Sequence, residues 1–267
     1  MDPHDDESCT TGWRNPFPET AFDLLGVRIH RLTRVQLLEC FRSALEPEEP
    51  VHFAYLNVAV SNQAADDPRT RDLLNRADLV YVDGAGVRLG CRLLGVDCPP
   101  RNTGADFLPH VLEMCARMGK TVGFLGGSPG AAENLRRSCR EKFPSLDIPF
   151  VRDGYGSLEE VASLEKELRE KTPDLLMVGL GVPKQEEWIE KSRNKYRVTL
   201  YWSVGALFEY DGGRVSRCPP WMGRAGLEWL YRLAVEPKRL WKRYLLGNPR
   251  FLLRCLFSRS RGRGATS

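Results

Sequence analysis

An apolar run from Leu79 to Val82 ends in Asp83, and two glycines, Gly84 and Gly86, follow this carboxylate closely. Such a run is typical of a buried parallel strand, and open α/β sheets bind ligands outside the carboxyl ends of their strands. We therefore expect Asp83 at the rim of a crevice, beside backbone that glycine lets a ligand approach. The structural alternative is a turn or a helix N-cap, because Asp before Gly is common in turns.

A second strand-like run, Thr121 to Leu125, ends in Gly126 and Gly127. Backbone N–H groups at such a turn, together with the N-terminus of the helix expected from Ala131 to Phe143, favour a phosphate or diphosphate. The spacing is neither that of a Walker loop nor the G-x-G-x-x-G of dinucleotide sites. The structural alternative is that these glycines serve helix–strand packing.

A strand-like run from Pro173 to Leu180 and a last strand with its turn from Tyr201 to Phe208 are also followed by glycines and polar residues, so we expect four strand ends to meet at one crevice. A glutamine in the first turn after such a strand can read a base or a sugar hydroxyl, because its amide both donates and accepts hydrogen bonds. The residues concerned are Gly181, Pro183, Gln185, Glu186 and Glu209. Gln185 and Glu186 are expected to face the crevice.

The segment from Arg101 to Asp106 precedes a helix expected from Phe107 to Met118. Thr103 is a plausible cap for that helix, and Asp106 would place a negative charge in its first turn. The functional alternative to a capped helix is a loop that contacts sugar or phosphate, in which Arg101 supplies a fork of donors.

Strands and helices alternate along the body of the chain, which predicts an α/β fold with right-handed βαβ units on a mostly parallel sheet. The first elements expected are a strand from Phe22 to Ile29 with a kink at Gly26, a helix from Thr33 to Leu45, a strand from Val51 that ends near Asn57, and a helix from Asp66 to Arg76. We expect residues 1–18 to be disordered, residues 19–212 to form the main domain, and residues 213–267 to form an appendage.

The appendage differs from the body in charge. Residues 213–267 carry 13 Lys/Arg against 2 Asp/Glu, a balance of +11, whereas the rest of the chain carries 26 against 33, a balance of −7. Aromatic residues lie between these basic residues, and mainly leucines recur at helical spacing, which together is typical of helices that lie on an anionic membrane surface. The alternatives are an ordinary packed helix with solvated charges and a patch that binds nucleic acid.

The eight cysteines form no C-x-x-C pair and lie at no metal-ligand spacing, so we expect free thiols in a reducing compartment and no metal site. The polar N-terminus does not resemble a signal peptide. No apolar run of about 18 residues is present, so we expect no segment that spans a bilayer.

Several motifs occur together and in order: Asp83-Gly84, Arg101 with Thr103-Gly104, Phe124 to Gly127, Gly179 to Glu186, Gly205 to Phe208, Gly226 to Leu233, Glu236 to Arg239, and Arg243-Tyr244. On these motifs, from about Phe22 to Phe257, the chain resembles the WecG/TagA/CpsF glycosyltransferases. The resemblance implies a Rossmann-like domain with a basic helical appendage that docks on the inner face of the cell membrane. It also implies transfer of a sugar from a UDP-sugar to an undecaprenyl-diphosphate-linked saccharide in cell-surface polysaccharide biosynthesis.

By the same resemblance, Asp83 is the general base and no metal ion or cofactor is needed. Gly126, Gly127, Gln185 and Glu209 would line the nucleotide, and Arg232, Arg239 and Lys242 would bind the acceptor diphosphate. The remaining substrate contacts that it implies are Asn57, Arg101, Thr103, Gly104, Asp106, Gly181, Pro183 and Glu186. We expect no nucleic-acid partner. The sequence does not decide the oligomeric state, and a homo-oligomer is one of the alternatives.

Three positions depart from the family pattern. Tyr55 stands where a threonine is frequent, Glu209 where an aspartate is common, and Lys242 where arginine is usual, with loss of bidentate geometry. These changes would alter sugar specificity or lower activity. The two alternative functions are a nucleotide-binding regulatory protein without catalysis and a nucleic-acid binder that uses the basic appendage.

Overall fold

The computed structural model describes residues 13–47, 49–97, 102–154, 158–211, 218–224 and 227–263. These residues form an eight-stranded sheet in the order β1-β2-β4-β3-β8-β7-β5-β6, in which only the β1–β2 pair is antiparallel. The strands are β1 (Ala21–Leu24), β2 (Val27–His30), β3 (Val51–Leu56), β4 (Leu79–Val82), β5 (Val122–Gly126), β6 (Phe150–Arg152), β7 (Leu175–Gly179) and β8 (Leu200–Ser203). The predicted α/β class with a mostly parallel sheet is confirmed.

Helices connect the strands and continue beyond the last one. In the body they are η1 (Pro18–Thr20), α1 (Arg34–Ala44), α2 (Val58–Asp66), α3 (Pro68–Asn75), α4 (Ala85–Leu94), α5 (Gly104–Met118), α6 (Ala131–Lys142), α7 (Leu158–Glu170), α8 (Lys184–Ser192) and α9 (Leu207–Asp211). Those that follow are α10 (Pro220–Arg224), α11 (Glu228–Val235), α12 (Pro237–Trp241), the π-helix η2 (Lys242–Leu246) and α13 (Gly247–Arg263).

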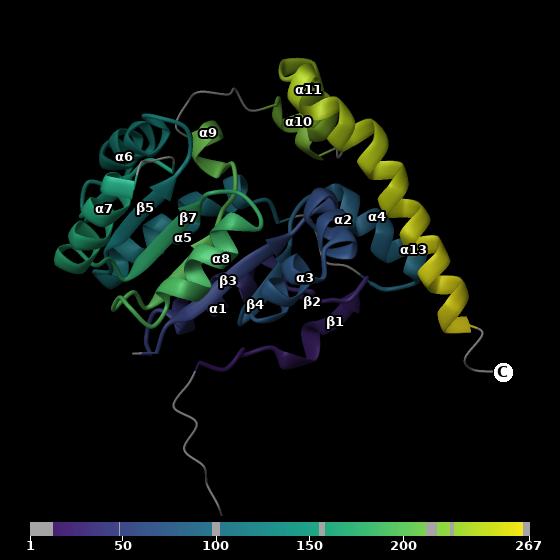
Figure 1. Cartoon of the computed structure of the whole chain (residues 1–267), viewed down its shortest axis with the longest axis horizontal. Coiled ribbons are helices and arrows are strands. Elements are labelled where there is room, and N and C mark those ends of the chain that lie inside the picture. Colours follow the sequence, from purple (N-terminus) through teal and green to yellow (C-terminus); the bar gives the residue numbers. More distant parts are fainter. Residues whose placement is uncertain are drawn as a thin grey trace, which may run out of the picture.

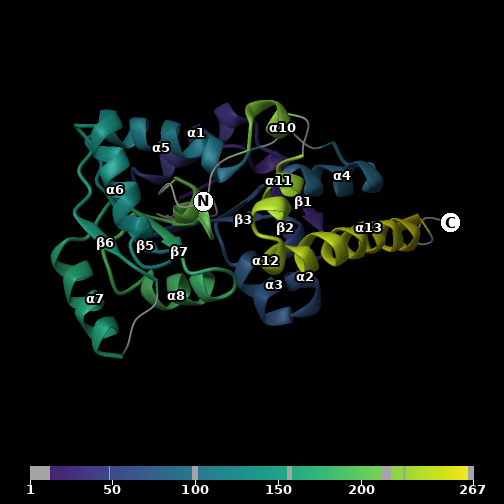
Figure 2. The ribbon, with the colours of Figure 1, turned by 90° about the horizontal axis from the view of Figure 1, so that it is seen from above.

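The sheet is covered on both faces, as Figures 1 and 2 show: α1, α5 and α6 lie on one side, and α2, α3 and α8 lie on the other. Alternate strand residues supply the two cores. Phe53 and Tyr81 pack in the core under α1 and α5, whereas Ala54 and Val80 pack in the core under α2 and α4. Because both faces are buried, the central strands are mostly apolar, as is typical of parallel strands, and the buried polar side chains of His52 and Ser203 are hydrogen-bonded to each other at 2.9 Å.

Local signals explain the element ends. Thr33 caps α1 in a capping box with Gln36. Asn57 follows β3 directly and caps α2, a helix that we did not predict. The expected single strand from Phe22 to Ile29 is wrong, because Leu25 and Gly26 both have positive φ and turn the chain into the β1–β2 hairpin.

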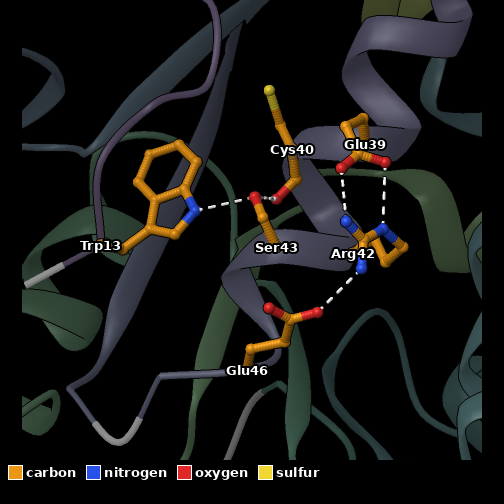
Figure 3. Close-up of polar contacts among 6 residues, drawn as sticks. All are labelled: Trp13, Glu39, Cys40, Arg42, Ser43 and Glu46. Carbon is orange, nitrogen blue, oxygen red and sulfur yellow. Dashed lines mark hydrogen bonds and ion pairs between the residues drawn. The ribbon is translucent and has the colours of Figure 1, made fainter.

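The segment before the first strand is held by Trp13. Its indole Nε1 donates a hydrogen bond of 3.0 Å to Ser43 Oγ, and its ring centroid lies 5.1 Å from that of Phe53. Figure 3 shows this bond next to Arg42, which pairs with Glu39 and Glu46 on the outside of α1. The expectation of disorder is therefore wrong for residues 13–18, and its remainder, residues 1–12, lies outside the described residues.

We use the term arm for the described residues from α10 to α13, 218–224 and 227–263. The boundary expected at residue 213 lies outside the described residues. α13 lies alongside α4 and α2 (Figures 1 and 2). Phe251 and Cys255 are fully buried there, and a Cβ added to Gly90 of α4 would lie 2.5 Å from the Phe251 ring. The arm is thus packed on the body through an apolar contact.

Polar contacts fix the same interface. Asn62 Nδ2 of α2 donates a 2.7 Å hydrogen bond to the Gly247 carbonyl, while Arg250 and Arg254 pair with Asp66. In the part of the chain that the structure describes, no helix combines the length and apolar character needed to cross a membrane. The described cysteines are free thiols, and all of them except Cys218 are buried.

Candidate active site

A cavity of about 930 Å³ opens at the carboxyl ends of β3, β4 and β8 and is bounded on the other side by the arm. The residues that follow these strands line it: Asn57, Asp83 and Val204. This is the edge of a parallel sheet at which ligands bind. From the N-terminal end of α5 come Thr103, Gly104 and Asp106, and from the arm come Glu228, Arg232 and Arg243.

Asp83 is held in place by its neighbours on the sheet. Its backbone N–H donates a 2.9 Å hydrogen bond to the Leu56 carbonyl, which joins it to the end of β3. Gly84 follows with φ of +89°, a value that glycine adopts without strain, and turns the chain into α4. Asn57 accepts the N-cap bond from Val60 N–H at 3.0 Å and is also hydrogen-bonded to Asp83. Both polar side chains are thereby aimed into the cavity.

The surroundings of Asp83 change its acidity. Burial raises the pKa of its carboxyl group to about 6, and the negative charge of Glu228 adds to this rise. The positive charges of Arg232 and Arg243 and the bond from Asn57 act in the opposite direction. A carboxylate with a pKa near 6 is still mostly ionised at pH 7 and is a stronger base than an exposed aspartate, so it suits proton abstraction.

Two arginines of the arm line the cavity, and only one of them, Arg232, is among the three residues that were expected to bind the acceptor diphosphate. Arg232 of α11 and Arg243 of η2 line it. Arg239 instead pairs with Glu236, and Lys242 lies 5.6 Å from the centre of the Trp241 ring, so neither lines the cavity. Arg243 belongs to one of the family motifs, but it is not among the substrate-binding residues that the resemblance implies. Glu228 was missed too, although it lies one helical turn before Arg232.

Two tyrosines form part of the cavity wall. Tyr55 and Tyr81 are opposite each other in the β3–β4 register, and both line the cavity. Trp202 Nε1 donates a 3.1 Å hydrogen bond to the Tyr81 hydroxyl. Burial raises the pKa of both hydroxyl groups, so they remain neutral and can donate hydrogen bonds. Tyr55 occupies one of the three positions at which the sequence departs from the family pattern.

Comparison with known proteins identifies the relationship. The chain matches the model of the glycosyl transferase WecG/TagA/CpsF family over residues 22–265. The chain belongs to this family. It is 32% identical over 190 residues to the N-acetylglucosaminyldiphosphoundecaprenol N-acetyl-beta-D-mannosaminyltransferase of Bacillus spizizenii, with 71% of this chain and 72% of that protein covered.

Proteins of the same name from two other bacteria are similar over more of the chain. The Bacillus subtilis protein is 28% identical over 201 residues, covering 75% of this chain and 77% of that protein. The Staphylococcus aureus protein is 26% identical over 220 residues, covering 82% and 86%. The resemblance that the sequence motifs indicate is therefore confirmed, and it includes the arm.

In this family member, the glycine turn after β5 lies apart from the cavity and is packed. A Cβ on Gly126 would lie 2.5 Å from the backbone of Gly179, and one on Gly127 would lie 3.1 Å from Phe208. Glu209 accepts hydrogen bonds from Ser128 N–H at 2.7 Å and from Ser128 Oγ at 2.8 Å. The Ser128 N–H, which could have bound a phosphate, is thus already bonded to Glu209. Nucleotide binding by this turn stays a prediction.

The segment after β7 also differs from expectation. Gln185 and Glu186 are buried and do not face the cavity, so that part of the prediction is wrong. Gln185 Oε1 accepts a 3.1 Å hydrogen bond from Gly205 N–H, and its Nε2 donates to Glu186 Oε1 at 2.7 Å. This amide therefore supports the turn that leads to Val204 and Ala206 of the cavity wall.

The other predicted contacts have three different outcomes. Gly181 and Pro183 do not line the cavity, and Arg101 lies outside the described residues. Thr103 occupies the N-cap position of α5, but its side chain makes no capping bond. Within the described ranges, no three His, Cys, Asp or Glu side chains gather in a group that could hold a metal ion.

Replacing Asp83 by asparagine is expected to stabilise the folded protein above pH 6. The folded state binds the Asp83 proton more tightly than the unfolded state, whose pKa is 3.8, so the aspartate destabilises the fold increasingly as pH rises from about 4 to 6. The difference corresponds to at most about 3 kcal/mol at pH 8 and to less at pH 5. Urea unfolding of both proteins at the two pH values measures it. A variant less stable than the natural protein at pH 8 would contradict this result.

Proposed function

We propose that this family member is an inverting glycosyltransferase that moves a sugar from a UDP-sugar to a polyprenyl-diphosphate-linked saccharide in cell-surface polysaccharide biosynthesis. Family membership supports the reaction class, and the names of the relatives support the lipid-linked acceptor. The observation that carries the proposal is the meeting of a carboxylate, Asp83, with two arginines of the arm, Arg232 and Arg243, in one cavity.

Asp83 acts as the general base in this mechanism. Its carboxylate takes the proton of an acceptor hydroxyl while that oxygen forms a bond to the anomeric carbon of the donor sugar. The bond from the anomeric carbon to the nucleotide diphosphate breaks at the same time, and the configuration inverts. The hydrogen bond from Asn57 and the backbone bond to Leu56 hold the carboxylate in one position, which favours proton transfer.

Arginines stabilise the charge of the diphosphates, and we propose that the transfer needs no metal ion. A guanidinium group matches two phosphate oxygens at once, so Arg232 and Arg243 can bind a diphosphate directly. Arg239 and Lys242 are exposed on the same arm outside the cavity, where they attract the acceptor diphosphate at the edge of the membrane before it enters. The Tyr55 and Tyr81 hydroxyls are donors for sugar oxygens.

In this proposal, the arm docks on the inner face of the cell membrane and so brings the cavity close to the lipid surface. Its exposed apolar side chains include Trp241, Leu245, Leu246, Leu253 and Phe257. Exposed basic residues, Lys238, Arg239, Lys242 and Arg250, lie along the same elements. Apolar side chains enter the headgroup region while basic ones contact anionic lipids, so the protein is peripheral and reaches a lipid-linked acceptor without spanning the bilayer.

A panel assay tests this function. Purified protein is incubated with one UDP-sugar at a time and a polyprenyl-diphosphate-linked N-acetylglucosamine, and the mass of the lipid product is measured by mass spectrometry. We expect one UDP-sugar to add one sugar residue to the lipid, with and without EDTA. Binding of UDP without transfer from any UDP-sugar would instead indicate a nucleotide-binding regulatory protein.

A further inference from the structure

The cavity contains a second group of arginines, away from those of the arm. Arg34 is the first residue of α1, and Arg88 and Arg92 lie one turn apart on α4; all three line the cavity. Among the residues that the structure describes, none of the three forms an ion pair. Arg88 Nε is buried and has no hydrogen-bond partner. A buried donor without a partner is costly, so it points to a ligand that supplies the acceptor.

Other arginines of the chain differ from these three. Arg42 pairs with Glu39 and Glu46, Arg193 pairs with Asp78, and Arg254 pairs with Asp66. In each of these three cases a carboxylate offsets the charge of the arginine. Arg34, Arg88 and Arg92 form no ion pair with a described residue, so their positive charges remain available to attract an anion.

The fold explains why α4 directs these side chains to the cavity. Val87, Gly90 and Cys91 form the buried face of α4, and α13 packs on it through Phe251. Arg88 and Arg92 are four residues apart and so share another face of the helix. Figure 2 shows α13 alongside α4. The contact that anchors the arm thus also orients the arginine face.

The proposed reaction has two diphosphates to bind, one on each substrate. In an inverting transfer the attacking oxygen and the leaving diphosphate lie on opposite sides of the anomeric carbon. Two multiply charged anions repel each other when they are close together. Two separate groups of cations are therefore needed, and the cavity has two: Arg232 and Arg243 from the arm, and the three arginines of α1 and α4.

We propose that Arg34, Arg88 and Arg92 form a second oxyanion subsite that holds the diphosphate of one substrate, while Arg232 and Arg243 hold the other. This inference rests on the proposed function for the identity of the two ligands. The nucleotide donor and the lipid-linked acceptor present the same chemical group, so binding measurements with one probe for each distinguish the two sources.

The test compares the Arg88→Gln/Arg92→Gln double variant with the full-length natural protein. Calorimetric Kd values are measured for UDP, which represents the donor, and for farnesyl diphosphate, which represents the acceptor. The matched control is Arg137→Gln/Arg140→Gln, which removes two exposed arginines from α6 at the other end of the sheet. We expect the Kd of one probe to rise at least tenfold and that of the other to change less than twofold, with no change in the control.

Equal rises for both probes would indicate a general effect of charge and would overturn the subsite. Changes below twofold for both probes, or no binding of either probe to the natural protein, would also overturn it. Circular dichroism checks the fold, and Arg92→Gln alone, at an exposed position, replaces the double variant if that variant unfolds, with a rise of at least threefold expected for one probe. These measurements do not use sugar transfer, so a protein that binds as expected but transfers no sugar would refute the proposed function alone.

Discussion

Asp83→Asn is expected to lower the rate of sugar transfer by at least about 100-fold, because general-base catalysis contributes about 10²–10⁴ to a rate. Asparagine keeps the shape of the side chain but cannot accept the proton of the acceptor hydroxyl. The Kd for UDP is expected to stay within twofold, since the carboxylate contacts the acceptor and not the nucleotide. Single-turnover transfer rates and calorimetric titrations measure the two quantities.

The control for this variant is Asp72→Asn, which changes an exposed carboxylate on α3, outside the cavity. It is expected to transfer sugar at the natural rate. If Asp83→Asn also keeps the natural rate, the base is not Asp83. If it loses UDP binding as well as transfer, the carboxylate contributes to nucleotide binding. The proposal that Asp83 contacts only the acceptor is then wrong.

The second large effect is expected for membrane binding. Leu246, Leu253 and Phe257 on the arm are 59%, 52% and 66% exposed, so their removal leaves the packed core intact. Replacing all three by serine removes about 3 kcal/mol of transfer free energy, because full burial of one such side chain is worth about 1.5–3 kcal/mol and each exposes only about half to two thirds of its surface. We therefore expect binding to vesicles with anionic lipids to weaken about 100-fold. Vesicle sedimentation across lipid concentrations measures the change.

Val35→Ser is the control for the arm variant, because Val35 is 77% exposed but lies on α1 in the body. Its vesicle binding is expected to equal that of the natural protein. Equal binding of the triple arm variant would show that the arm does not dock on the membrane. A truncation of the whole arm is a poorer test, because it would remove Phe251 and Cys255 from the core that they share with α4.

The residues at strand ends were predictable, since an apolar run followed by polar residues and glycine is a local signal. Asp83 was predicted in this way and lines the cavity, whereas Asn57, which also lines it, was implied only by the family resemblance. Which strand ends are neighbours was not predictable, because it depends on the order of the sheet. β8, the last strand in the chain, lies between β3 and β7, so the ends of β5 and β7 lie away from Asp83.

The arm shows a second limit of local patterns. Lys242 was predicted to bind the acceptor, whereas the adjacent Arg243 lines the cavity. The π-helix η2 begins at Lys242 and has more residues per turn than an α-helix, so it changes which side chains face the body. Trp13 is another residue whose role could not be predicted from local sequence. It contacts Ser43, which is 30 positions away, and the composition around Trp13 does not indicate this contact.

The pH dependence of kcat/KM tests the role of Asp83 most directly. We expect kcat/KM of the natural protein to rise with pH as Asp83 ionises, with a midpoint near pH 6. Glu228→Gln removes a negative charge that raises the pKa of Asp83, so its midpoint is expected at a lower pH. A profile without this acidic limb, or a limb at the same pH in both proteins, would contradict proton abstraction by Asp83 in this cavity.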